Sequence, residues 1–152
     1  MSKITLEVDA PDTLPCIVDG ERIEQVLRNL LGNAVKFSAA NSVVKLNAFA
    51  DSETEAIVVR VIDAGPGIPA GEESMVFERF SQSTATKTAA GGTGLGLPIC
   101  KEIITHHQGQ LSVRNNTDSG ATFEFTLPAS LNADASGDIP LLRGDHTSRK
   151  AA

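Results

Sequence analysis

The sequence predicts an α/β fold of two layers, in which a mixed sheet is covered on one face by helices. Two observations lead to this prediction. Apolar residues recur at a helical period in two segments, 19–37 and 95–108, and alternate at a strand period in five others. The order along the chain is strand, helix, two strands, helix and two strands. That order is typical of helices packed on one sheet.

The first half of the chain is predicted to hold one strand, one long helix and a hairpin. The segment "ITLEV" alternates apolar and polar residues, and the two prolines of "DAPDTLP" end it. Two further strands are predicted at Val43–Ala50 and Ala56–Asp63, with a polar turn at "DSET". An amphipathic helix is predicted between the first strand and Val43, with Asp19 as its N-cap. Its apolar residues at the helical spacing are Ile23, Val26, Leu27, Leu30, Leu31 and Ala34.

The second half begins with a loop, "AGPGIPAGEE", and a short helical segment, "SMVFERF". The next stretch, "SQSTATKTAAGGTG", holds no apolar residue larger than alanine, so it cannot pack in a core and is expected to be mobile. A helix from about Leu95 to Gln108 and a hairpin of "QLSVRNN" and "GATFEFTL" follow. Residues 1–128 are therefore predicted to form one domain, and residues 129–152 a disordered linker or tail.

Composition excludes several classes of protein. Aromatic residues make up 4% of the chain, and the net charge is −6, which argues against base stacking and against binding of a nucleic-acid backbone. No apolar run approaches the ~20 residues that span a bilayer, and the N-terminus lacks the pattern of a signal peptide. Cys16 and Cys100 lack CxxC spacing and are expected to be reduced, buried thiols. We therefore expect a cytoplasmic domain that binds no nucleic acid.

The predicted first helix carries a polar ridge beside its apolar face. At about 100° per residue, Asn29, Asn33 and Lys36 lie within about 60° of one another, at the rim of the surface that the helix covers. Amide oxygens can ligate Mg²⁺ without adding charge that would repel a polyphosphate, and Lys36 can supply a positive charge for phosphate. On its own, however, the ridge is better explained as a solvated helix face.

Three further segments favour a binding site. "VIDAGPGI" places Asp63 on the core side of its strand, where a buried carboxylate needs a donor such as the amino group of adenine. Gly65 and Gly67 would let the backbone approach a flat ring. "GGTGLGLPI" places glycine amides at a helix N-terminus, where they can hold an anion. In "FERF", Phe77 and Phe80 are expected to anchor the chain in the core just before the mobile stretch. Each segment alone has a plainer explanation: a tight turn, a glycine-rich hinge and core packing.

Together and in this order, the segments resemble the ATP-binding domain of sensor histidine kinases. They match the N box ("QVLRNLLGNAVKFS"), the G1 box ("VIDAGPGI"), the F box ("VFERF") and the G2 box ("GGTGLGL") of that family. The resemblance covers roughly Ile4 to Leu127. The family is similar in fold to the gyrase, Hsp90 and MutL ATPases. The resemblance therefore implies a Bergerat fold, an α/β sandwich whose mixed sheet is mostly antiparallel.

The resemblance also implies a site for ATP and Mg²⁺. Asn33 is expected to be the principal Mg²⁺ ligand, with Asn29 assisting at the metal one helical turn earlier. Lys36 is expected to contact phosphate. Asp63 is expected to hold the adenine amino group. Thr122, in "GATF", matches a strand position near the adenine that often carries a small hydroxyl.

Glycine-rich segments complete the site that the resemblance implies. Gly65 and Gly67 are expected to shape the adenine pocket, and residues 81–91 to form a lid over the nucleotide. The family often has a basic residue after the F box that reaches the γ-phosphate, and here the candidates are Arg79 and Lys87. The other expected nucleotide contacts are Ile68, Phe80, Gly92, Thr93, Gly94, Leu95, Gly96 and Leu97.

Position 29 separates the activities known for this fold. Its ATPases and serine kinases carry a carboxylate one helical turn before the metal asparagine, whereas Asn29 cannot act as a general base. Imidazole is already nucleophilic near neutral pH, so phosphoryl transfer to histidine needs no such base. Catalysis would then depend on positioning and charge neutralisation. The sequence favours a protein histidine kinase, with a degenerate, ATP-sensing kinase domain and an ATPase of the same superfamily as alternatives.

None of the three histidines resembles a phosphoacceptor. His106 and His107 lie at a helix end, where they suit the helix dipole, and His146 lies in the expected tail. The resemblance implies an acceptor histidine on a separate dimerisation domain of a homodimeric parent kinase, which can be membrane-anchored. A response regulator is the expected downstream partner. We expect this chain to be a monomer that binds Mg-ATP without phosphorylating itself.

Overall fold

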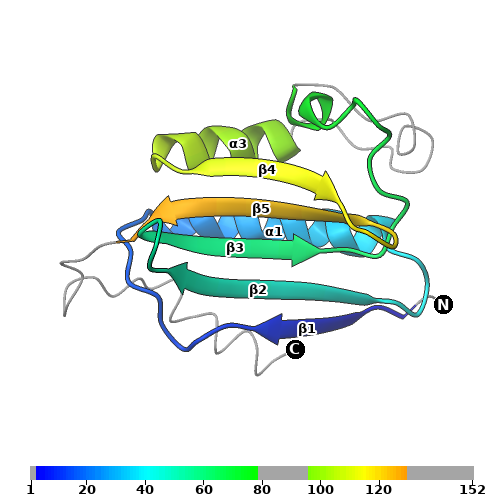
Figure 1. Cartoon of the computed structure of the whole chain (residues 1–152), viewed down its shortest axis with the longest axis horizontal. Coiled ribbons are helices and arrows are strands. Elements are labelled where there is room, and N and C mark those ends of the chain that lie inside the picture. The colour runs from blue at the N-terminus through cyan, green and yellow to red at the C-terminus, as the bar shows by residue number, and fades with distance from the viewer. Residues whose placement is uncertain (1–2, 79–95, 130–152) are drawn as a thin grey trace.

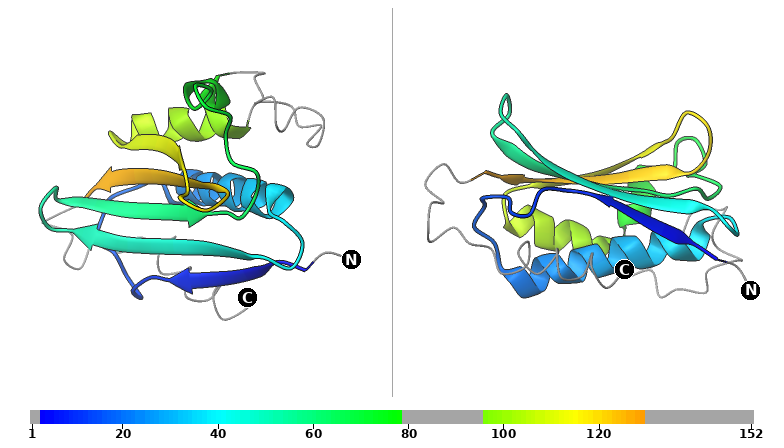
Figure 2. Two further views of the ribbon diagram at one scale, coloured as in Figure 1. Left: turned by 45° about the vertical axis from the view of Figure 1, so that its right-hand side comes forward. Right: turned by 90° about the horizontal axis from the view of Figure 1, so that it is seen from below.

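The structure, a computed structural model, describes residues 3–78 and 96–129. These residues form two layers, a five-stranded sheet and two helices that cover one of its faces (Figures 1 and 2). The elements are, in chain order, β1 (Thr5–Asp9), α1 (Gly20–Phe37), β2 (Val43–Asp51), β3 (Ala56–Ile62), the 3₁₀ helix η1 (Ser74–Phe77), α3 (Gly96–His106), β4 (Gln110–Asn115) and β5 (Ala121–Pro128). The predicted α/β sandwich with helices on one face is confirmed.

The sheet is mixed and mostly antiparallel, with the strand order β1-β2-β3-β5-β4. β1 runs parallel to β2, and the other neighbouring strands are antiparallel. Because β5 lies between β3 and β4, the end of β3 is next to the start of β5, where Ile62 pairs with Thr122. The residues that follow β3 therefore lie beside the turn of the β4–β5 hairpin (Figure 1).

Helix α1 forms where the apolar spacing predicts it. The carboxylate of its N-cap, Asp19, accepts a hydrogen bond from the backbone N–H of Arg22 at 3.3 Å, which satisfies an amide that has no partner within the helix. The helix ends before Ser38, whose backbone is extended. The side chains that it buries are Ile23, Val26, Leu27, Leu30 and Ala34.

Helix α3 packs against α1 and is linked to it at one end by a histidine. The Nε2 atom of His107 accepts a hydrogen bond from the backbone N–H of Asp19 at 3.0 Å. Its Nδ1 atom lies 2.8 Å from the carbonyl oxygen of Ile103 and donates to it, since a ring nitrogen that accepts leaves the proton on the other. His107 thus joins the end of α3 to the start of α1, a contact that its position at a helix end did not predict.

Element ends differ slightly from the predictions. The last helix ends at His106, two residues early, because Gln108 takes a left-handed conformation with φ 62°. The 3₁₀ helix is shorter than the helical segment predicted from "SMVFERF". The expected lid at 81–91 lies outside the described residues, and so does the expected tail apart from Ala129, whose N–H donates to the carbonyl of Glu55 at 2.9 Å.

The core lies between the two layers and includes both cysteines. Cys16 and Cys100 are free, buried thiols, as predicted. Burial raises the pKa of Cys16 to about 12 and that of Cys100 to about 11, so both stay protonated and unreactive near neutral pH. The largest wholly buried side chains are Phe125, Ile23, Leu30, Ile57 and Ile104.

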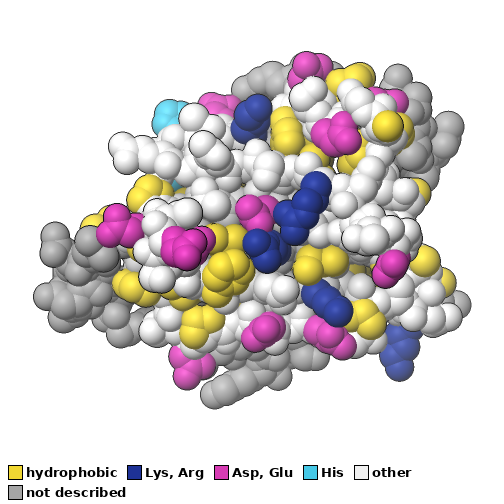
Figure 3. Space-filling model, in the orientation of Figure 1, with side chains coloured by type: hydrophobic (Ala, Val, Ile, Leu, Met, Phe, Trp, Pro, Cys, Tyr) yellow, Lys and Arg dark blue, Asp and Glu magenta, His cyan; other side chains and the backbone are white. Residues whose placement is uncertain are grey.

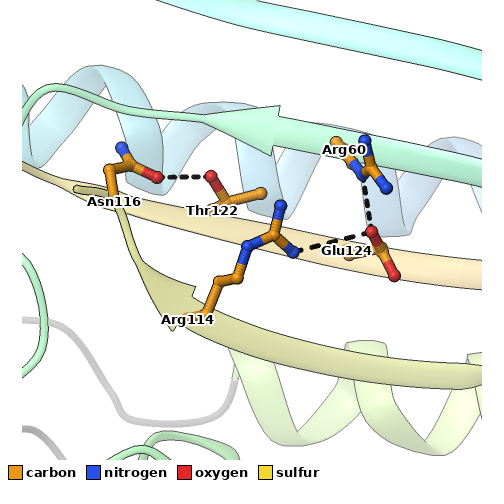
Figure 4. Close-up of polar contacts among 5 residues, drawn as sticks. All are labelled: Arg60, Arg114, Asn116, Thr122 and Glu124. Carbon is orange, nitrogen blue, oxygen red and sulfur yellow. Dashed lines mark hydrogen bonds and ion pairs between the residues drawn. The ribbon is translucent and has the colours of Figure 1, made fainter.

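The other face of the sheet carries charged side chains and, in the described part of the chain, no helix (Figures 2 and 3). Arg60 donates to Glu124 at 2.6 Å and lies 5.1 Å from the centre of the Phe49 ring. Arg114 lies 3.7 Å from the same carboxylate (Figure 4). Such a polar outer face is typical of a one-sided antiparallel sheet. Neither described helix has the length and apolar character that crossing a bilayer requires.

Candidate functional site

Asp63 directly follows β3, and its side chain faces the helix layer. The side chain is 9% exposed and lies on the strand face of Val59 and Val61, as the alternation predicts. Its Oδ1 atom accepts hydrogen bonds from the backbone N–H groups of Gly65 at 3.0 Å and Ala121 at 2.9 Å. Burial raises the pKa of Asp63, and these two hydrogen bonds oppose the shift.

Among the described residues, Oδ1 carries both of the hydrogen bonds that the Asp63 carboxylate accepts. Within residues 3–78 and 96–129, no donor reaches Oδ2. A buried carboxylate oxygen without a donor is costly, so its place suits a ligand that brings one. The exocyclic amino group of adenine is a donor of this kind.

The loop after β3 is held between the end of α1 and the sheet. Ala64 donates its N–H to the hydroxyl of Ser38 at 3.1 Å, and its carbonyl accepts from the N–H of Ala39 at 3.2 Å. Gly65 lies so close to α1 that a Cβ there would be 2.5 Å from the carbonyl oxygen of Phe37. Only glycine fits at this point, and it lets the loop reach the helix.

One residue of the polar ridge of α1, Asn29, points its amide toward the start of α3. The Nδ2 atom of Asn29 donates to the carbonyl oxygen of Gly96 at 3.4 Å and lies 3.5 Å from Sγ of Cys100. Because the nitrogen faces α3, the amide oxygen of Asn29 stays available for another partner. Asn33 is half-buried, and Lys36 is exposed with its Nζ 5.9 Å from the centre of the Phe37 ring.

Helix α1 therefore connects three parts of the predicted site. Its middle contacts α3 through Asn29 and Gly96, and its last residue, Phe37, contacts the loop at Gly65. The N-box helix, the G1 loop and the end of the G2 box are thus brought together, although they lie far apart in the sequence. Leu97, next to Gly96, packs against the core.

The residues present fit a magnesium ion that is shared with a polyphosphate. The described residues contain no group of three or more His, Cys, Asp or Glu side chains that could hold a metal ion. The oxygens of Asn29 and Asn33 are neutral oxygen donors, which Mg²⁺ accepts together with phosphate and water. A magnesium ion bound by these two amides would share its remaining coordination between phosphate and water.

Thr122 is placed differently from the expectation that it lies near the adenine. Its hydroxyl donates to Oδ1 of Asn116 at 2.5 Å, on the sheet face that the helices leave uncovered (Figure 4). Since strand neighbours alternate between faces, Ala121 and Phe123 lie on the Asp63 side instead. β5 contributes the backbone N–H of Ala121 to this site, not the hydroxyl of Thr122.

The F box begins at the end of η1, and the segment that follows it carries several of the expected nucleotide contacts. Phe77, in the F box, makes an edge-to-face contact with Phe123 at 6.2 Å between ring centres. Lys101 of α3 holds its Nζ 5.5 Å from the centre of the same Phe77 ring, so the F box is anchored to both layers. The expected site residues outside the described part are Arg79, Phe80, Lys87, Gly92, Thr93, Gly94 and Leu95.

Two asparagines that were not predicted as site residues hold the G1 loop from the side of the sheet. Asn115 bonds to the backbone of Ile68, and Asn116 to the carbonyl of Asp63. Gly120 has φ +85°, and a Cβ there would overlap the carbonyl of Asp63. The sequence signal is "NNTDSG", which predicts a turn but does not indicate a contact with a loop 47 residues away.

Known proteins resemble this chain over most of its length. Residues 18–131 match the family described as "Histidine kinase-, DNA gyrase B-, and HSP90-like ATPase". The sensor protein KdpD of Escherichia coli (strain K12) is 39% identical over 127 residues, which cover 84% of this chain and 14% of KdpD. This chain therefore corresponds to a small part of that longer protein.

Two solved structures share both sequence and fold with the chain. The mycobacterial sensor histidine kinase MprB superposes with a TM-score of 0.71 at 30% identity, covering 83% of this chain and 82% of that one. Full-length ShkA in complex with AMPPNP gives a TM-score of 0.70 at 32% identity, covering 86% of this chain and 27% of ShkA.

Proposed function

Because this chain belongs to the histidine kinase-, DNA gyrase B- and HSP90-like ATPase family, we propose that it is the ATP-binding catalytic domain of a two-component sensor histidine kinase. It binds Mg-ATP and transfers the γ-phosphate to a histidine on a separate dimerisation domain. The observation that carries this proposal is the buried carboxylate of Asp63, one oxygen of which accepts no hydrogen bond from the described residues. Asp63 starts the loop that contacts the end of α1, the helix whose polar ridge includes Asn29.

In this proposal Asp63 selects adenine, and hydrogen bonds from the backbone fix the orientation of its carboxylate. Two N–H groups bond to Oδ1 of Asp63, so Oδ2 is left to accept from the 6-amino group of the base. A 6-oxo purine would present a carbonyl oxygen to this acceptor and would be rejected, since both groups are then unpaired. Gly65 and Gly67 carry no side chain that would keep the ring away. ShkA, a similar protein solved with AMPPNP, supports an adenine nucleotide as the ligand.

Asn33 and Asn29 hold Mg²⁺ through their amide oxygens in this proposal. A magnesium ion held by these residues would supply positive charge that neutralises the phosphate oxygens. Lys36, at the exposed end of the ridge, adds a positive charge toward phosphate. Arg79 or Lys87 reaches the γ-phosphate, and the other nucleotide contacts come from Ile68, Phe80, Gly92, Thr93, Gly94, Leu95, Gly96 and Leu97.

The amide at position 29 supports transfer to histidine over hydrolysis. Asn29 cannot remove a proton from water, and its nitrogen already donates to the carbonyl of Gly96. A neutral imidazole attacks the γ-phosphate without a base. The acceptor histidine lies on the dimerisation domain of a homodimeric parent kinase, and a response regulator receives the phosphoryl group from it.

A transfer assay in trans tests this function. The chain is incubated with Mg²⁺ and ATP labelled at the γ-phosphate, together with the acceptor-histidine domain of its parent kinase. Label on that histidine is the expected result. Bound ATP without transfer would instead indicate a domain that senses ATP. Release of labelled phosphate in the absence of the acceptor would indicate an ATPase.

A further inference from the structure

Asn115, the last residue of β4, reaches across to the loop that follows β3. Its Oδ1 atom accepts from the backbone N–H of Ile68 at 2.7 Å, and its Nδ2 atom donates to the carbonyl oxygen of Ile68 at 2.8 Å. One side chain therefore satisfies both backbone groups of Ile68, as a neighbouring strand would do in a sheet. These are short bonds, and they fix the far end of the loop.

Asn116 holds the near end of the same loop. Its Nδ2 atom donates to the carbonyl oxygens of Asp63 and Ser119, both at 3.0 Å, and its Oδ1 atom accepts from the hydroxyl of Thr122 (Figure 4). Both donors and the acceptor of this amide are thus used. The carbonyl of Asp63 is thus held by Asn116, while its N–H donates to the carbonyl of Ala121 at 2.9 Å.

The loop between these two points needs external support. Gly65 and Gly67 give it more conformational freedom than other residues would, and that freedom must be lost before a ligand can bind. Gly67 has φ +82°, and a Cβ there would lie 2.8 Å from Oδ1 of Asn115, so the glycine and the asparagine fit closely. Asn115 itself is exposed and outside the core. Its bonds therefore bear on the local order of the loop more than on global stability.

We propose that Asn115 and Asn116 are positioning residues for adenine recognition, which act by holding the two ends of the Asp63–Ile68 loop. This inference rests on the proposed function, because it takes Asp63 and the loop glycines to face the base. Neither asparagine needs to touch the nucleotide. Their loss weakens binding because the loop then has to be ordered by the ligand.

Four variants separate this role from a general loss of stability. Asn115→Ala removes both bonds to Ile68, and Asn115→Asp keeps the shape and the acceptor but places an oxygen against the Ile68 carbonyl. Asn116→Asp keeps the acceptor for Thr122 and loses the donor to Asp63. Thr117→Ala, at an exposed position of the same turn, is the matched control.

Three measurements are made on each variant: the affinity for Mg-ADP and Mg-IDP by calorimetry, the exchange rate of the Ile68 amide by NMR, and the midpoint of thermal unfolding. Both Asn115 variants are expected to bind Mg-ADP about tenfold more weakly, and Asn115→Ala to speed Ile68 exchange. Asn116→Asp is expected to reduce the preference for ADP over IDP, because it acts at Asp63. Thr117→Ala is expected to match the wild type in all three.

The outcomes distinguish this inference from the function on which it rests. Normal ADP binding by the wild type and by both Asn115 variants would overturn the positioning role while leaving the function intact. The positioning role would also be overturned if the variants lost affinity for Mg-ADP only in proportion to the fall in their midpoint of thermal unfolding. If the wild type binds neither nucleotide, the function and the inference fail together.

Discussion

The amide nitrogen of Asn29 lies 3.4 Å from the carbonyl oxygen of Gly96, so the middle of α1 meets the first residue of α3. This contact joins the polar ridge of one helix to the glycine-rich start of the other. It also sets the direction of the Asn29 amide, because its nitrogen faces the carbonyl and its oxygen faces away. The orientation of one amide thus links the packing of two helices to the proposed metal site.

Asn29→Asp is expected to reduce phosphoryl transfer at least tenfold. The carboxylate has the same shape, but it would repel the Gly96 carbonyl and would add negative charge beside the phosphates. The measurement is the initial rate of labelling of the acceptor histidine at saturating ATP. Asn47→Asp, on the uncovered face of the sheet, makes the same chemical change away from the site and should retain the wild-type rate. Equal rates for both variants would count against a role for Asn29.

Asn33→Ala is expected to abolish the dependence of nucleotide binding on Mg²⁺, because it removes the proposed principal metal ligand. Titration of the variant with ADP, with and without Mg²⁺, is the measurement. The wild type should bind more tightly with the metal, whereas the variant should show one affinity in both conditions. A metal effect of wild-type size in the variant would assign the ligand to another residue.

Asp63→Asn is expected to weaken Mg-ADP binding at least tenfold, or about 1.4–3 kcal/mol, and Mg-IDP binding much less. The amide would still accept from Gly65 and Ala121, but its nitrogen would face the 6-amino group of adenine, donor against donor. Calorimetric titration with both nucleotides is the measurement. Asp118→Asn, in the exposed hairpin turn, removes the same charge and should bind like the wild type.

The raised pKa of Asp63 gives a pH dependence of known sign. Burial favours the protonated form in the folded state, so folded protein holds more protons than unfolded protein above the ordinary value of 3.8. The contribution of Asp63 to the free energy of unfolding therefore falls as pH rises through the acid range above 3.8. Urea unfolding of the wild type and of Asp63→Asn should show the variant gaining stability relative to the wild type over this range. A constant difference would contradict the assignment.

His107→Ala is expected to lower the free energy of unfolding by about 1–2 kcal/mol. The backbone N–H of Asp19 would lose its acceptor at the start of α1, and the link between the two helices would be lost. His106→Ala provides the control, because the neighbouring histidine is exposed and has no such bond among the described residues. Urea denaturation measures both. Equal losses would show that the helix end, and not this hydrogen bond, is responsible.

Gly120→Ala is expected to destabilise the fold by about 3 kcal/mol or more. Gly71 and Gly120 both have φ +85°, but a Cβ at Gly71 would meet nothing within 4 Å, whereas one at Gly120 would overlap the carbonyl of Asp63. Gly71→Ala therefore measures the cost of the backbone conformation alone, about 1 kcal/mol. The difference between the two variants in urea unfolding measures the steric clash. A similar loss for both would mean that the loop can move away from the hairpin.

Features that depend on neighbours in the chain were predictable from the sequence. The spacing of apolar residues located α1 and its N-cap, Asp19, and alternation along β3 placed Asp63 on the core face. Both follow from the fixed geometry of helices and strands, which needs no knowledge of the partner surface. Four ordered motifs then led to the family, because they carry the residue types that the family shares.

Two features of the site, the orientation of Thr122 and the contact between Asn115 and Ile68, depend on how the strands pair and were decided by the tertiary structure alone. Thr122 lies in a matched motif, yet its hydroxyl bonds to Asn116, because the register of β5 against β3 turns Ala121 toward Asp63 instead. Asn115 meets Ile68 only because β4 and β5 bring their turn to the end of β3. A register shift of one residue would exchange every inward side chain of β5 for an outward one, and the packing of the whole sheet, not the local sequence, selects the register.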